Sequence, residues 1–124
     1  MIKPEIESFL SVDLELNGPL PDPEDCAFAF EVAIGPKSEE GPEFFQFTVI
    51  TPKFLIRESS TSQVENARWD RGCLILDRFS WHEVERSLEK LLLHCRKKTW
   101  SEVAYELNKE MRWEFENYQE HSPG

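Results

Sequence analysis

The sequence lacks the residue patterns that most catalytic and metal sites require. It contains no CxxC, HxxxH or HExxH spacing, and the adjacent pair His94–Cys95 would point about 100 degrees apart on a helix. No serine lies in a G-x-S-x-G turn, and the segment Gly35–Pro42 lacks the Gly-Lys-Ser/Thr end of a phosphate-binding loop. We therefore expect no metal, no cofactor and no enzymatic activity.

Cysteines and long apolar runs are also scarce. The 3 cysteines form an odd set without a repeated spacing, which does not predict a disulfide framework and fits a reducing compartment. No apolar run approaches the ~20 residues that cross a bilayer, and the first ten residues have no signal-peptide pattern. We expect one cytoplasmic domain over residues 1–124, with residues 119–124 as a frayed tail.

Basic residues are few, 14 against 24 acidic ones, so the formal net charge is -10. This balance argues against binding to a nucleic-acid backbone or to an anionic membrane, because both need clustered Lys and Arg. It permits a basic protein partner, because a negative field steers such a partner toward the chain. The alternative is that the charge serves solubility alone.

The stretch Cys26–Leu55 predicts a long β-hairpin at the centre of a sheet. Large apolar residues recur at every second position of Cys26–Ile34, whose other face is small or acidic, either solvated or closely approached. A second aromatic strand, Glu43–Thr51, follows the Gly-Pro connector. Residues 4–12 and 73–79 read as two further strands, the first with Ile6, Leu10 and Val12 on one face and Phe9 on the other.

Helices are predicted after each of three capping signals. Thr51-Pro52 starts one or two turns over residues 52–58. Ser80 with Glu83, and Thr99 with Glu102, form capping boxes. Each box precedes apolar residues at helical spacing, and the apolar residues after the Thr99 box continue to Tyr118. Because strands come first and helices last, we expect an α+β fold: an antiparallel sheet of about four strands covered by two C-terminal helices.

Acidic and aromatic residues are the remaining candidates for a binding surface. Glu39 and Glu40 lie in the hairpin connector, which is either an ordinary exposed turn or an acidic patch for a basic partner. Tyr105 and Trp113 fall beside the core stripe of the last helix, and Trp69 lies in a polar segment. These aromatics favour packing against neighbouring elements, with binding anchors as the alternative.

Two stretches together resemble a known family. They are IGPKSEEGPEFFQFTVITPKFL, residues 34–55, and TWSEVAYELNKEMRWEFENYQE, residues 99–120. Four motifs, in this order, resemble those of the bacterial immunity protein 8 family. They are the connector Gly-Pro-x-x-Glu-Glu-Gly, the step Thr-Pro-Lys-aromatic-Leu, the helix start Thr-Trp-x-Glu and the end Trp-Glu-Phe-Glu. The two stretches cover about a third of the chain, and residues 59–71 match nothing in this pattern.

The resemblance implies a cytoplasmic protein that binds and neutralises the C-terminal domain of a cognate polymorphic or contact-dependent toxin. Nucleases that hold phosphates tend to be basic, so we expect a basic nuclease whose active site or substrate cleft is occluded. The toxin-binding candidates are Glu39, Glu40, Glu43, Trp113, Glu114 and Glu116. The alternative is an acidic chaperone or adaptor for a secreted effector. The sequence leaves the oligomeric state and the toxin's chemistry open.

Overall fold

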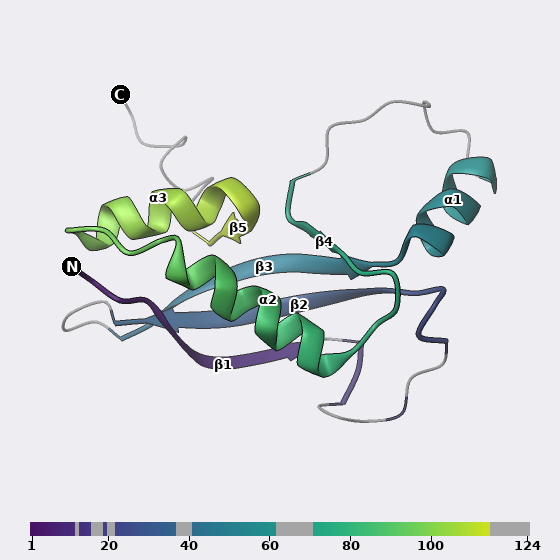
Figure 1. Cartoon of the computed structure of the whole chain (residues 1–124), viewed down its shortest axis with the longest axis horizontal. Helices are drawn as coiled ribbons and strands as arrows, with labels where there is room; N and C mark the ends of the chain where they lie inside the picture. The colour runs from purple at the N-terminus through teal and green to yellow at the C-terminus, as the bar shows by residue number, and fades with distance from the viewer. Residues whose placement is uncertain (12, 16–18, 20–21, 37–40, 62–70, 115–124) are drawn as a thin grey trace.

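The computed structural model describes residues 1–11, 13–15, 19, 22–36, 41–61 and 71–114. Within these ranges, five strands and three helices follow one another (Figure 1). In chain order they are β1 (Glu5–Ser11), β2 (Ala27–Gly35), β3 (Glu43–Ile50), α1 (Pro52–Thr61), β4 (Cys73–Ile75), α2 (Trp81–Leu93), α3 (Trp100–Glu110) and β5 (Arg112–Trp113).

The hairpin of β2 and β3 forms the centre of the sheet, as its alternating pattern predicted. The strands pair antiparallel, with Phe30 opposite Phe47 and Val32 opposite Phe45. All four of these side chains are buried on the face that packs against the helices. The two-residue period of the sequence therefore fixes which face of the sheet becomes the core.

Strand β1 differs from its prediction because it contains an irregularity between Ile6 and Ser8. One extra residue shifts the alternation, so that Ile6 and Phe9 both pack against the core. Leu10 instead lies on the opposite face and is 51% exposed. The expected grouping of Ile6 with Leu10 is wrong, and Val12 lies outside the described residues.

The sheet is mixed rather than antiparallel, which corrects one part of the predicted fold. Strand β4 pairs with β3 in parallel, from Cys73 opposite Thr48 to Ile75 opposite Ile50. The chain leaves the end of β3 through α1 and returns beside the last three residues of β3, where β4 runs in the same direction. Parallel neighbours need such a long crossover. The strand expected over residues 73–79 ends at Ile75.

Helix α1 begins at the predicted cap. The Thr51 side chain is fully buried, and its Oγ1 accepts hydrogen bonds from the backbone N–H groups of Cys26 at 3.0 Å and of Phe54 at 3.4 Å. The same hydroxyl therefore starts the helix and ties it to the beginning of β2. The helix continues to Thr61, three residues beyond the predicted range.

The two C-terminal helices cover one face of the sheet, as predicted (Figure 1). Ser80 Oγ accepts from the Glu83 N–H at 3.3 Å, and Thr99 Oγ1 accepts from the Glu102 N–H at 3.2 Å, so both capping predictions are confirmed. The buried stripes of α2 and α3 complete the core with Val84, Leu88, Leu92, Val103, Ala104 and Leu107. The α+β class is therefore confirmed.

Helix α3 is shorter than the sequence predicted. It ends at Glu110, although the apolar spacing continues toward Tyr118. At Met111 the backbone becomes extended, and the next two residues form β5, which pairs antiparallel with β3. The Asn108 side chain accepts from the Trp113 N–H at 2.9 Å. Hydrogen bonds to the edge of β3 thus replace the helical bonds of a further turn.

Candidate functional site

A buried carboxylate joins three elements at the hairpin end of the sheet. Glu43, the first residue of β3, is 2% exposed. Trp113 Nε1 donates to its Oε2 at 2.8 Å, and Trp100 Nε1 donates to its Oε1. Indole N–H groups donate and carboxylate oxygens accept, and charge-assisted bonds of this kind offset the cost of burying a charge. We refer to Glu43, Trp100 and Trp113 as the Glu43 cluster.

The residue after β5 extends the pairing with β3. The Glu114 N–H donates to the Phe44 carbonyl at 3.1 Å, and the Phe44 N–H donates to Glu114 Oε1 at 2.9 Å. The Glu114 side chain thus takes the place of a backbone acceptor while the residue stays exposed to solvent. Phe44 itself is 40% exposed. Beside the Glu43 cluster the surface therefore presents an aromatic ring and a carboxylate.

The structure brings together three of the six residues proposed from the sequence. Glu43, Trp113 and Glu114 meet where β3 and β5 pair, although they come from distant parts of the chain. Glu43 is inside the cluster, Trp113 is half-buried, and Glu114 is exposed. The other three, Glu39, Glu40 and Glu116, lie outside the described residues.

The other aromatic candidates have separate positions. Trp113 is on β5 rather than on the last helix, and it packs against the core as well as on Glu43. Tyr105 is 65% exposed, with Lys109 Nζ 5.0 Å from its ring centroid, so the packing expected for Tyr105 is wrong. Trp69 lies outside the described residues.

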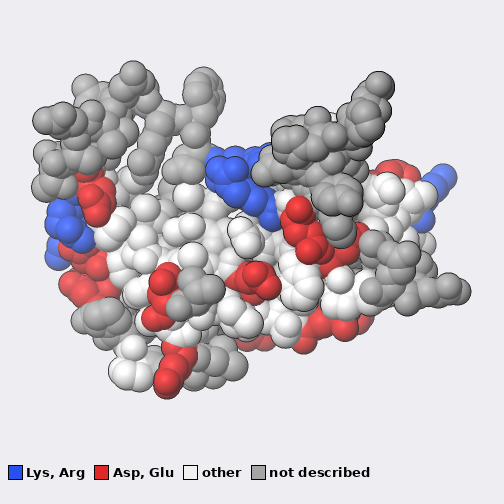
Figure 2. All heavy atoms as spheres, turned by 180° about the vertical axis from the view of Figure 1, so that it is seen from behind, with Lys and Arg blue, Asp and Glu red and all other residues white. Residues whose placement is uncertain are grey.

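The sheet face opposite the helices exposes several large apolar side chains. Figure 2 shows the molecule from behind, with mostly white atoms between patches of acidic and basic side chains. Leu10, Phe44 and Ile75 each expose two-fifths or more of their surface, and their strand registers place them on this face. The exposed residue Ala29 lies on the same face, in the lining of a pocket shared with Glu31 and Arg112. Sequence alternation predicted the small residues but not the exposed apolar ones.

Among the residues that the structure describes, no three His, Cys, Asp or Glu side chains form a group that could hold a metal ion. In the same part of the chain, no helix combines the length and apolar character that crossing a membrane requires.

Comparison with known protein families places the chain beside immunity proteins. The family model described as Immunity protein 8 matches residues 6–118, from the beginning of β1 to beyond β5. No curated protein matches the chain, and no solved structure matches it. The match includes the Glu43 cluster and the long segment between α1 and β4.

Proposed function

The chain belongs to the immunity protein 8 family, and from this premise we propose that it binds and neutralises a cognate bacterial toxin. The toxin is the C-terminal domain of a polymorphic or contact-dependent system, and the complex forms in the cytoplasm. The observation that carries this proposal is the extent of the family match, which spans 6–118 and therefore nearly all of the folded domain.

The chemistry of the toxin is inferred from charge. A net charge of -10 makes the chain an electrostatic complement to a basic protein and a poor ligand for phosphates. Nuclease domains need basic clefts to hold their substrate. We infer a basic nuclease whose active site or substrate cleft is occluded by acidic and aromatic residues, without any catalytic step on this chain.

The proposed contact surface surrounds the Glu43 cluster. Glu43 and Trp113 fix the position of β5 against β3 from within, because their hydrogen bond is mostly shielded from water. Glu114 and Phe44 lie at the surface beside them. The candidate carboxylates of Glu39, Glu40 and Glu116 belong to the segments that lead into β3 and follow β5 in the sequence. These segments supply the acidic contacts in this proposal.

Growth rescue with a pull-down tests the function. The bait is the toxic C-terminal domain encoded immediately upstream in the source genome, co-expressed with this chain or with an empty vector. Survival together with a one-to-one complex supports the proposal. A complex without rescue would favour an acidic chaperone or adaptor for a secreted effector. If the chain neither forms a complex with this bait nor rescues growth, both functions are refuted for this bait.

A further inference from the structure

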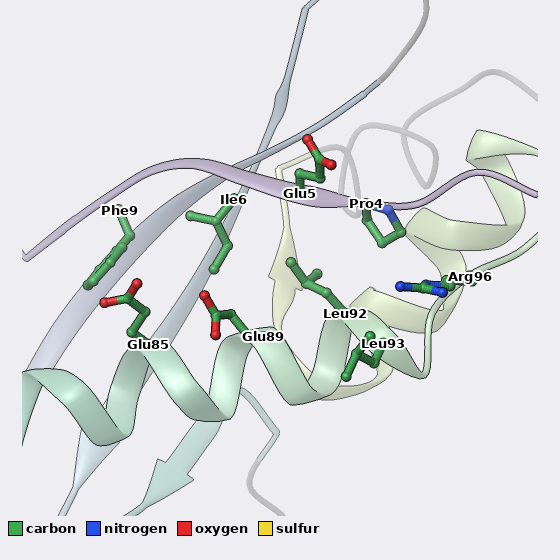
Figure 3. Close-up of a pocket in the computed structure, with 9 residues that line it drawn as sticks. All are labelled: Pro4, Glu5, Ile6, Phe9, Glu85, Glu89, Leu92, Leu93 and Arg96. Atoms are coloured by element: carbon green, nitrogen blue, oxygen red, sulfur yellow. The ribbon is translucent and has the colours of Figure 1, made fainter.

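A groove of about 560 Å³ lies between β1 and α2, on the opposite side of the domain's core from β4. Its lining is apolar along β1 and acidic along α2: we call Ile6, Phe9 and Leu92 its floor and Glu85 and Glu89 its rim, while the Glu5 carboxylate points away from α2 (Figure 3). In Figure 3 the side chains of Ile6 and Phe9 extend from β1 toward α2, and the carboxylates of Glu85 and Glu89 extend back toward β1. We refer to this feature as the β1–α2 groove.

Two local features of the sequence create the groove. The irregularity in β1 turns both Ile6 and Phe9 toward the helix layer, instead of only one of them. On α2 the spacing of Glu85, Glu89 and Leu92 places these residues along one side of the helix. The groove is thus apolar at depth and charged at its helical rim.

The acidic rim is not neutralised by its neighbours. Within the ranges that the structure describes, the carboxylates of Glu85 and Glu89 take part in no ion pair. Like charges at positions i and i+4 of a helix destabilise it, so Glu85 and Glu89 repel each other across one turn. Arg96, at the end of the groove beside Pro4, is the one basic residue of the lining (Figure 3). Glu85 and Glu89 against Arg96 leave the groove with one net negative charge, which a cation from outside would relieve.

The groove also runs along an open sheet edge. Strand β1 pairs with β2 alone among the strands in the described part of the chain, so its outer edge offers backbone N–H and C=O groups to a new strand. The hydrogen bond from the Ile2 N–H to the Lys97 carbonyl, 2.7 Å, closes the end of the groove near Arg96. A peptide segment in the groove could therefore contact the backbone edge of β1, the apolar floor and the carboxylate rim at the same time.

We propose that the β1–α2 groove receives an extended, basic segment of the toxin, which adds to the edge of β1. Aliphatic stems of Lys or Arg would lie on Ile6 and Phe9, and their charged ends would meet Glu85 and Glu89. Charge decides against other occupants, because nucleic acid, an anionic membrane or a second copy of this acidic chain would bring further negative charge. This inference rests on the proposed toxin-binding function and adds a second surface, between β1 and α2, to the one around the Glu43 cluster.

The test compares charge reversal inside and outside the groove. Glu85→Lys with Glu89→Lys reverses the rim, and Glu15→Lys with Asp77→Lys makes the same change in net charge at two exposed carboxylates elsewhere. Affinity for the upstream-encoded toxic domain is measured by calorimetry, alongside growth rescue. The groove variant is expected to bind at least about tenfold more weakly, while the control binds within about threefold of wild type.

Backbone readouts separate docking from a general charge effect. Hydrogen exchange of the β1 amides, residues 5–11, should slow on complex formation if a strand adds to this edge. The double variant Glu85→Gln with Glu89→Gln removes the repulsion between the two carboxylates, so it should fold normally. It should still bind the toxic domain several-fold more weakly than wild type. This variant keeps the proposal testable even if the Lys double variant fails to fold.

The outcomes distinguish the two proposals. If wild type rescues growth but the groove variants bind as tightly as the control, or β1 exchange is unchanged, the groove proposal is wrong and the toxin-binding function stands. If wild type neither binds nor rescues, the function fails and the groove proposal fails with it.

Discussion

Glu43 and Trp113 are 70 residues apart in the sequence and are joined by a hydrogen bond of 2.8 Å from indole Nε1 to carboxylate Oε2. Trp100, at the start of α3, donates to the other oxygen of the same carboxylate. One side chain therefore positions the first turn of α3 and the short strand β5 relative to the start of β3. Its role is to shape the proposed contact surface, since only 2% of Glu43 is exposed.

Replacing Glu43 should destabilise the fold. Glu43→Ala leaves two indole N–H groups without this acceptor, and we expect a loss of about 2–4 kcal/mol in the free energy of unfolding. Glu43→Gln keeps the shape and one acceptor oxygen, so its loss should be smaller. Urea unfolding followed by tryptophan fluorescence measures both losses, because the two hydrogen-bond donors, Trp100 and Trp113, are themselves fluorescent.

A double-mutant cycle isolates the pair. Trp113→Phe removes the donor and keeps an aromatic ring, and the combined variant with Glu43→Gln should show a coupling energy of at least ~0.5 kcal/mol. The matched control is Glu15→Gln, at an exposed carboxylate, where we expect a change within about 0.5 kcal/mol. Additive effects at Glu43 and Trp113 would contradict the structural role assigned to this hydrogen bond.

Charge reversal in the hairpin connector should weaken toxin binding. Glu39→Lys with Glu40→Lys is expected to reduce affinity by about tenfold or more, because it replaces two proposed acidic contacts with repulsive ones. Circular dichroism should show an unchanged fold. Calorimetry with the toxic domain measures the affinity, and the control is Asp77→Lys, near the opposite end of β3. Equal affinities of wild type and variant would place the interface elsewhere.

Ionic strength should control the association rate. If the net charge of -10 steers a basic toxin, stopped-flow association should slow by about tenfold or more between low and high salt. Dissociation should change less, because steering acts on encounter. A flat salt response would assign the acidic composition to solubility alone.

Two thiols should be protected in the folded state. Burial is the largest cause that raises the pKa of both Cys26 and Cys95, and Asp22 and Asp25 add to it at Cys26. With an aromatic disulfide reagent at pH 8, we expect both thiols to react much more slowly than Cys73, which is only partly buried. Mass spectrometry of the labelled peptides gives the order, and early labelling of Cys26 or Cys95 would contradict the buried placement.

The same pKa shifts predict a loss of stability at high pH. A raised folded pKa means that the native state keeps its thiol protons while the unfolded chain releases them. Below the unfolded thiol pKa of about 8.5 the free energy of unfolding keeps its full contribution from these groups, and it falls as pH rises above that value. The midpoint of urea unfolding at pH 8 and pH 10 measures the change. The double variant Cys26→Ser with Cys95→Ser should lose this pH dependence.

Local signals in the sequence predicted the elements that depend on neighbouring residues. The alternation of Phe28, Phe30 and Val32 gave the core face of β2, and the capping boxes at Ser80 and Thr99 gave the first turns of α2 and α3. These predictions succeed because a two-residue period, or a hydroxyl three residues before an N–H, is complete within one short segment. The motifs around the connector and the last helix identified the family for the same reason.

Pairings between distant segments decided the rest. The direction of β4 depends on the crossover through α1, and the end of α3 depends on the edge that β3 offers to β5. The exposure of Glu43 could not be derived from its position beside a Gly-Pro turn, because the indoles that bury it come from residues 100 and 113. The sequence by itself determined the α+β class, the helix starts and the family. Only the tertiary structure decided the mixed sheet, the buried carboxylate and the β1–α2 groove, since each requires contacts between residues that no local pattern links.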